Sequence, residues 1–188
     1  MEAFAQAIGL VGMLFNLLAY QQKTQKNVLI CQFFAALTFG VNYLLLGAVI
    51  GGLLNFTGAV RAAVFYFEKK THANSLPWLI VFVTAFAASY PLTFLVFGTP
   101  PSVKNLIIEL LPVLSMILAT FSLRLGSAKA VRSFGLICSP LWLIYNCFSG
   151  SIGAIASEIL NLSSIFVGIY RLDRKGNLAE QEAKKPDT

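Results

Sequence analysis

Long apolar runs separated by short polar segments dominate the chain up to residue 170. Runs with no charge, or with a single one, cover residues 3–20, 28–67, 77–97, 105–123 and 133–170. A helix that crosses a bilayer needs about 20 mostly apolar residues. The second and last runs are about twice that length, so each is expected to turn and cross twice. The pattern therefore predicts an all-α membrane protein with seven transmembrane helices.

Glycine-rich segments indicate where the two double-length runs turn. The first long run contains Gly47, Gly51 and Gly52 near its middle, and any of them offers a turn. The last long run contains the sequence Ser-Gly-Ser-Ile-Gly at residues 149–153. Glycine allows backbone conformations that other residues avoid, so both segments suit a tight reversal between two helices.

The composition excludes most soluble classes of protein. Hydrophobic residues make up 57% of the 188 residues, and charged residues only 12%, about half the share in an average soluble domain. Too few polar groups are present to cover a globular surface, which argues against a soluble domain, a coiled coil and a disulfide-stapled secreted module. The lipid bilayer is therefore the expected partner.

The basic residues are distributed unequally between the two sides of the predicted bundle. With seven spans, only Lys104 falls on the N-terminal side. Basic loops stay in the cytoplasm, so the N-terminus is predicted outside and the C-terminus inside. This orientation also explains the net charge of +6 without a nucleic acid partner. Twelve basic residues share the predicted cytoplasmic side: Lys23, Lys26, Lys69, Lys70, Arg124, Lys129, Arg132, Arg171, Arg174, Lys175, Lys184 and Lys185.

The spans before and after the run 77–97 are laid out alike. A shift of 103 residues aligns three pairs of landmarks: Lys26 with Lys129, Gly47 with Gly150, and Asn55 with Glu158. Three spans per half is an odd number, so one extra crossing gives both halves the same direction, a parallel 3+1+3 repeat. The predicted parts are a three-helix bundle at 1–70, a loop and linker helix (77–97) within 71–103, a second three-helix bundle at 104–170, and a polar cytoplasmic tail at 171–188.

Several strings carry a family resemblance. They are Glu-Leu-Leu-Pro-Val at 109–113, Trp-Leu-Ile-Tyr-Asn at 142–146 and Gly-Ser-Ile-Gly at 150–153, followed by Glu158; Leu-Leu-Gly-Ala at 45–48, Asn55 and Arg61 also fit. With these strings the chain resembles the YgjV family of bacterial inner membrane proteins. That family is similar to the wider PQ-loop group, which includes SWEET sugar transporters and KDEL receptors. The resemblance implies the 3+1+3 arrangement and a multi-pass inner-membrane location.

Polar residues within the spans are the candidate binding residues. A charge inside a membrane helix costs about 3 kcal/mol. Arg61, Glu109 and Glu158 are therefore each expected to have a structural or binding role that offsets this cost. Arg61 and Glu158 lie on the third helices of their halves and are expected to face a common interior, where they could pair. The SWEET-like group has a binding Asn on helix three and another on helix seven, which implies Asn55 and Asn161. The candidate substrate-binding set is Asn42, Asn55, Arg61, Trp142, Tyr145, Asn146, Glu158 and Asn161.

Structural roles for these residues stay open beside the binding role. Membrane helices use Asn as a link between helices. A long Arg side chain can reach the interface, and the aromatic residues can serve packing alone. Glu109 lies only five residues from Lys104, so it could reach the interface as well.

No pattern of catalytic chemistry is present in the sequence. A nucleophile–base pair, a metal-ligand cluster, a phosphate loop and a nucleotide fingerprint are all missing, so neither an enzyme nor a cofactor nor a metal is expected. Two functions stay open. One is a transporter or facilitator of a small polar solute; the other is a non-transporting receptor, assembly factor or partner subunit. A homo-oligomer is a further open alternative.

Overall fold

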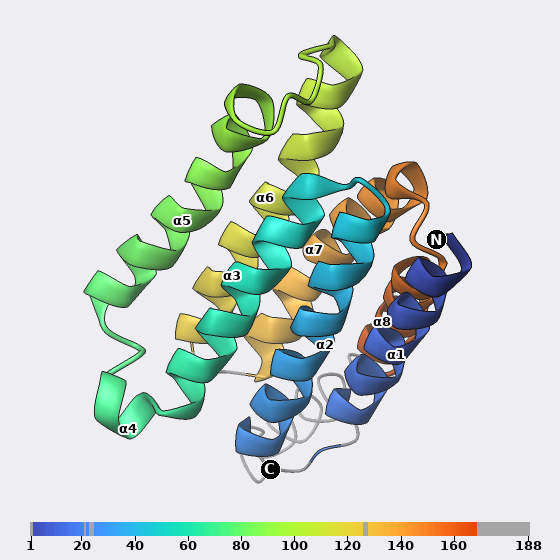
Figure 1. Cartoon of the computed structure of the whole chain (residues 1–188). Coiled ribbons are helices and arrows are strands. Elements are labelled where there is room, and N and C mark those ends of the chain that lie inside the picture. Colours follow the sequence, from blue (N-terminus) through green and yellow to red (C-terminus); the bar gives the residue numbers. More distant parts are fainter. Residues whose placement is uncertain (1, 21, 23–24, 126–127, 169–188) are drawn as a thin grey trace, which may run out of the picture.

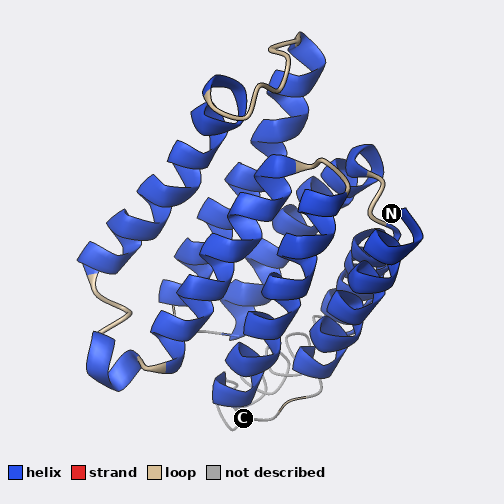
Figure 2. Ribbon diagram, in the orientation of Figure 1, coloured by secondary structure: helices blue, strands red, loops and turns tan. Residues whose placement is uncertain are grey.

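The computed structural model describes residues 2–20, 22, 25–125 and 128–168. Within these residues the protein is all-helical, with eight helices and no strand (Figures 1 and 2). Seven of the helices lie on the predicted apolar runs. The helices are α1 (Glu2–Tyr20), α2 (Gln25–Leu45), α3 (Val49–Tyr66), α4 (Glu68–Thr71), α5 (Leu76–Leu95), α6 (Val103–Arg124), α7 (Ala128–Ser149) and α8 (Ile152–Gly168).

Two glycine turns, at Gly47 and Gly150, divide the double-length runs. Their φ angles are 74° and 71°, a left-handed conformation that glycine adopts without steric cost. Gly51 and Gly52, the other candidates for the first turn, lie instead inside α3 and are buried. A Cβ atom on Gly51 would collide with the ring of Tyr43. Gly51 therefore serves the close packing of α3 against α2 rather than the reversal of the chain.

The short helix α4 is an element that the hydrophobic pattern does not predict. It ends at Thr71 and is followed by His72, whose φ of 52° is left-handed. The Asn74 amide donates a hydrogen bond to the Glu68 carboxylate at 2.6 Å, and the Trp78 indole N–H donates to the Thr71 carbonyl at 2.8 Å. These bonds fold the connection between α3 and α5 against the start of α5.

Five of the described helices, α1, α2, α3, α5 and α6, have the length and hydropathy of a membrane span. Helices α7 and α8 contain shorter apolar segments, Ser133–Ser149 and Ile152–Val167. Large hydrophobic side chains such as Leu14, Val60 and Ile107 are about half exposed on the outer faces. Such a surface is stable in lipid, where apolar side chains cost nothing to expose.

Six helices form a closed ring, and α5 packs outside it. Around the ring, α1 contacts α2, α2 contacts α3, α3 contacts α6, α6 contacts α7, α7 contacts α8, and α8 contacts α1. Helix α5 contacts α3 and α6 from the outer side (Figure 1). Gly153 lies so close to α1 that a Cβ atom there would collide with the backbone of Gly9. Gly153 thus lets the last described helix close the ring against the first.

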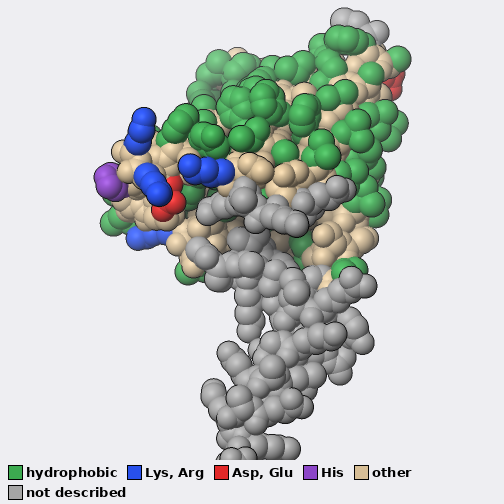
Figure 3. Space-filling view, turned by 90° about the horizontal axis from the view of Figure 1, so that it is seen from below, with side chains coloured by type: hydrophobic (Ala, Val, Ile, Leu, Met, Phe, Trp, Pro, Cys, Tyr) green, Lys and Arg blue, Asp and Glu red, His purple; other side chains and the backbone are tan. Residues whose placement is uncertain are grey.

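Basic side chains gather at one end of the bundle, called the basic end below. Lys26 lies in the first turn of α2, Lys69 and Lys70 lie in α4, and Arg124 is the last residue of α6. Figure 3 shows Lys and Arg side chains at this end beside the histidine. Lys104 lies in the first turn of α6, at the opposite end, together with the two glycine turns. That end is called the glycine-turn end. Lys23, the tail at 171–188 and the side chains of Lys129 and Arg132 lie outside the described residues.

Candidate functional site

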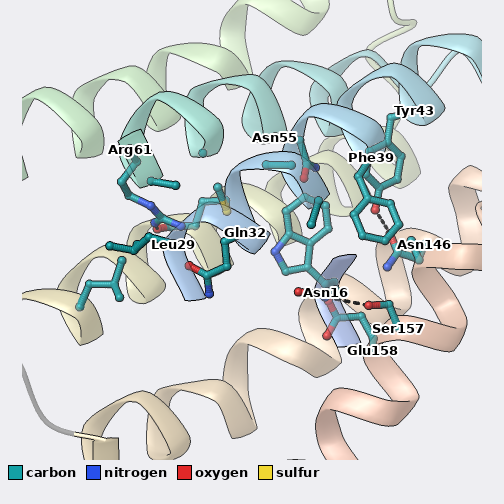
Figure 4. A pocket seen from close by; sticks show the side chains of 18 residues that line it. Asn16, Leu29, Gln32, Phe39, Tyr43, Asn55, Arg61, Asn146, Ser157 and Glu158 are labelled. Carbon is teal, nitrogen blue, oxygen red and sulfur yellow. Dashed lines mark hydrogen bonds between the residues drawn. The ribbon is translucent and has the colours of Figure 1, made fainter. Parts of the chain in front are cut away.

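A cavity of about 160 Å³ lies at the centre of the ring. A single water needs about 10–15 Å³ of such space, so the cavity has room for several waters or one small solute. A concave site with convergent polar groups is where a ligand is expected to bind. All six ring helices contribute to its lining (Figure 4): Asn16 from α1, Gln32 from α2, Arg61 from α3, Met116 from α6, Trp142 from α7 and Glu158 from α8.

One part of the lining is a wall of aromatic rings and amides. Tyr43 and Trp142 are stacked, with ring centroids 6.0 Å apart and an angle of 25° between the rings. The Asn55 amide donates to the Gly51 carbonyl at 2.8 Å, which leaves the Asn55 side-chain oxygen without a partner among the described residues. Gln32 makes no side-chain hydrogen bond within the same residues. Both amides are therefore available to a molecule in the cavity.

Arg61 enters the cavity from the second half of α3. One terminal nitrogen donates to the Thr120 hydroxyl at 2.7 Å and to the Met116 carbonyl at 3.3 Å. The guanidinium also lies over the Phe86 ring, 5.4 Å from its centroid, a cation–π contact. These partners come from α6 and α5, and none of them carries a negative charge. The other N–H groups of the guanidinium, which has five in total, have no partner in the described part of the chain.

Glu158 enters the cavity from the first half of α8. The Asn161 amide donates to its carboxylate at 3.4 Å and to the Ser139 hydroxyl at 2.7 Å, and Ser139 is a second hydrogen-bond partner of the carboxylate. The preceding residue, Ser157, accepts a hydrogen bond from Asn16 of α1 at 2.7 Å. The carboxylate is thus held by polar neighbours on α7 and α8 that carry no positive charge.

The predicted ion pair between Arg61 and Glu158 is not formed within the described residues, although both side chains line the same cavity. Arg61 is twelve residues beyond the start of α3, whereas Glu158 is six beyond the start of α8. Both helices begin at the glycine-turn end. At 1.5 Å per residue the two positions differ by about 9 Å along the bundle axis. The two charges therefore lie on different sides of the cavity, with Gln32 between them in Figure 4.

A hydrogen-bonded group of five buried residues closes the cavity at the glycine-turn end. Asn42, Tyr43, Tyr145, Asn146 and Ser151, called the amide–tyrosine cluster below, are each at most 2% exposed. Because the cluster joins α2 and α3 to α7 and the turn before α8, it connects both sides of the ring. Its bonds run from the Tyr43 hydroxyl to Asn146 Oδ1 (2.5 Å), from the Ser151 hydroxyl to Asn42 Oδ1 (2.6 Å), from Asn42 Nδ2 to the Ala5 carbonyl (2.7 Å) and from the Gly51 N–H to the Tyr145 hydroxyl (3.0 Å).

Of the eight sequence-predicted residues, five line the cavity and three lie outside its lining. Asn42 and Tyr145 lie in the amide–tyrosine cluster, beyond the lining of the cavity. Asn161 lies behind Glu158 and donates to its carboxylate. Glu109, the third charged residue within the spans, is not among the lining residues, and one of its carboxylate oxygens is buried without a hydrogen-bond partner in the described structure. The five predicted residues that line the cavity are Asn55, Arg61, Trp142, Asn146 and Glu158.

Sequence reasoning missed three polar lining residues, Gln32, Ser157 and Asn16. Asn16 carries the same signal as the predicted asparagines, an amide inside an apolar run. Gln32 could have been found by helical spacing, because it lies on one face of α2 with Phe39 and Tyr43, at intervals of seven and four residues. Ser157 had no signal of its own, since serine is common in membrane helices as a partner for neighbouring backbone groups.

One comparison with known proteins gives a match. The family model Imp-YgjV, whose description is bacterial inner membrane protein, matches residues 3–176. Apart from Glu2, the match covers all eight described helices, and it includes every residue that lines the cavity. Neither a curated protein nor a solved structure shows significant similarity.

Proposed function

This chain belongs to the Imp-YgjV family of bacterial inner membrane proteins, and we propose that it carries a small polar solute across that membrane. The observation behind this proposal is the central cavity, to which all six ring helices contribute. Two charged residues and several amides meet there, inside a bundle whose outer faces are apolar. Intramembrane charges that face a cavity typically mark a path for a substrate or an ion.

The proposed topology has seven spans, with the N-terminus outside and the C-terminus in the cytoplasm. In addition to the five helices with the length and hydropathy of a span, α7 and α8 supply shorter apolar segments. Successive long helices alternate in direction (Figure 1). The basic end, with Lys26, Lys69, Lys70 and Arg124, would then face the cytoplasm according to the positive-inside rule.

The proposed architecture is the parallel 3+1+3 repeat, as in the PQ-loop group. The order of contacts around the ring supports it, because α1–α2–α3 and α6–α7–α8 follow each other in the same sense. The contact of α3 with α6 then corresponds to the contact of α8 with α1. The glycine turns lie 103 residues apart and have nearly equal φ angles. In this arrangement α5, outside the ring, is the linker helix.

The proposed mechanism is alternating access to the cavity from the two ends. The amide–tyrosine cluster closes the glycine-turn end, whereas the lining continues toward the basic end as far as Leu29 and Leu123. The Tyr43–Asn146 bond joins α2 to α7 across the ring. Opening the glycine-turn end would require this bond and its neighbours in the cluster to separate. A solute bound between the two halves would then reach the opposite side.

Uptake into proteoliposomes tests the proposal. The purified protein is reconstituted, and the entry of radiolabelled amino acids, sugars and small organic acids is compared with protein-free liposomes. Gly58 lines the cavity near Met116, so Gly58→Phe should fill the cavity and abolish uptake. Val60→Phe places the same side chain on the exposed face of α3, where Val60 is 57% exposed, and should leave uptake unchanged.

Two results would contradict the proposal. If no solute enters faster than it does with protein-free liposomes, the protein is not a transporter of these classes. If a solute binds to the purified protein but does not enter the liposomes, the protein is a receptor or partner subunit.

A further inference from the structure

We propose that the cavity recognises a zwitterion, a small molecule with one carboxylate and one ammonium group, such as a small α-amino acid. This inference rests on the proposed function and names the class of solute. It follows from the placement of Arg61 and Glu158, which line one cavity without forming an ion pair within the described residues. Each charge has only neutral partners, and a zwitterion supplies the missing opposite charge to both.

Arg61 is the carboxylate-binding side. Its contacts to Thr120, Met116 and Phe86 fix the guanidinium but leave the N–H groups of the second terminal nitrogen without a partner in the described structure. A guanidinium presents its donors in a planar fork that matches the two oxygens of a carboxylate. A carboxylate in the cavity would therefore complete the hydrogen bonding of Arg61 and balance its charge.

Glu158 is the ammonium-binding side. Asn161 and Ser139 orient its carboxylate, yet no lysine or arginine contacts it among the described residues. An ammonium group has three N–H donors and no acceptor, so it needs a site that is rich in oxygen. Glu158 supplies the carboxylate oxygens. The side-chain oxygen of Asn55 is a further acceptor, because Asn55 lines the same cavity and this oxygen has no partner in the described chain.

The charge balance of the lining separates a zwitterion from other solutes. Among the described residues, only Arg61 and Glu158 are charged residues that line the cavity, and their charges cancel. A neutral sugar would leave both charges without a counter-charge. A solute with a single charge would satisfy one residue and be repelled by the other, and leaving a buried charge without its partner is costly. A zwitterion satisfies both and leaves the net charge of the cavity unchanged.

The geometry also limits the size of the solute. The two charged positions differ by about 9 Å along the axis, and their side chains extend toward each other from α3 and α8, with the Gln32 amide between them (Figure 4). The volume of about 160 Å³ is suited to a small amino acid. The stacked rings of Tyr43 and Trp142 form an apolar wall for its short side chain.

Binding of matched analogues tests the inference. The chain has two tryptophans, so Trp78→Phe leaves Trp142 as the only tryptophan and its fluorescence as the reporter. The probes are three amino acids, each with its amine-only and acid-only analogue: glycine with methylamine and acetate, L-alanine with ethylamine and propionate, and L-serine with ethanolamine and 3-hydroxypropionate. At least one amino acid should bind saturably, and at least tenfold more tightly than both of its analogues.

Substitutions assign the two ends of the bound molecule. Arg61→Met should weaken binding of the amino acid to the level of its amine-only analogue, and Glu158→Gln to the level of its acid-only analogue. Arg61→Lys and Glu158→Asp should recover part of the affinity. Arg124→Met removes an exposed charge and Glu68→Gln a half-buried one, both outside the cavity, and neither should have an effect. If a variant fails to fold, the analogue series on the unsubstituted cavity decides the question by itself.

Three outcomes overturn the inference. One is that none of the three amino acids binds. Another is that an acid-only or amine-only analogue binds as tightly as its amino acid. The third is that glycerol or D-glucose binds and neither Arg61→Met nor Glu158→Gln changes its affinity. In the last case uptake of that neutral solute into proteoliposomes would still support transport, so the class of solute would be wrong and the proposed function would stand.

Discussion

Tyr43→Phe is the most direct test of the amide–tyrosine cluster. The substitution removes one hydroxyl group and keeps the ring that stacks on Trp142. The lost hydroxyl donates to Asn146 Oδ1 at 2.5 Å, and Tyr43 and Asn146 are 2% and 1% exposed. Bulk water does not reach such a buried position, so the Asn146 oxygen loses its hydrogen bond unless a water in the cavity, which Asn146 also lines, replaces the hydroxyl.

The structure sets the expected magnitude. A buried polar group that loses its partner costs about 1–3 kcal/mol. For a chain of this size, 1 kcal/mol corresponds to a change of about 2–4 °C in Tm. The expected loss is therefore at least about 2 °C, and it should reach several degrees if the pocket around Asn146 stays dry. Because the cluster closes the glycine-turn end, the same variant should also favour opening at that end and change the rate of solute uptake.

Thermal unfolding in detergent measures the change in Tm. The matched control is Tyr66→Phe, since Tyr66 lies on α3, is only partly buried and makes no side-chain hydrogen bond within the described residues. Its Tm should change by less than about 1 °C, because a substitution away from buried networks is nearly neutral. Asn146→Ala, alone and combined with Tyr43→Phe, completes a double-mutant cycle whose coupling energy isolates the bond. The reasoning is refuted if Tyr43→Phe is no more destabilising than Tyr66→Phe, or if the two losses in the cycle add without coupling.

Three further outcomes are expected. Gly153→Ala should lower Tm more than Gly135→Ala, because the new methyl group meets the backbone of α1 at Gly153 but only the end of a flexible side chain at Gly135; equal losses would speak against the tight contact of α1 with α8. In a variant without native cysteines, Lys70→Cys should react with a membrane-impermeant maleimide only from the cytoplasm and Val103→Cys only from the periplasm, and the reverse pattern would invert the proposed orientation. Glu109→Leu should not lower Tm, since it removes a buried carboxylate oxygen without a partner among the described residues; a clear loss measured by thermal unfolding would reveal a stabilising role for this carboxylate.

The sequence predicted the long helices well because their apolar runs must match the thickness of a bilayer. It could not place the first turn at Gly47 rather than at Gly51 or Gly52, because a glycine that turns the chain and a glycine that admits a neighbouring helix look the same in a sequence. The four residues of α4 are too few to show a period.

The sequence predicted those site residues that are polar or charged within an apolar span. Arg61 and Glu158 were identified because charges are rare in membrane helices, and both line the cavity. Their direct pairing was wrong because it depends on how far the two helices are offset along the axis, which composition does not encode. Tyr145 was assigned to binding but belongs to the amide–tyrosine cluster. Which side of a helix faces a cavity depends on all its neighbours.

The contact of α1 with α8 has a consequence for the biogenesis of the protein. Asn16 on α1 donates to Ser157, a residue 141 positions later in the chain, and Gln6 bonds to the backbone at Gly150 and Ile152. At a synthesis rate of 5–20 residues per second the partners of α1 emerge on the order of ten seconds after it. Throughout that interval these amides face lipid, a chaperone or the insertion machinery without their final partners. A nascent chain that stops before α8 exposes the same amides permanently, and quality-control proteases of the membrane could recognise it by them.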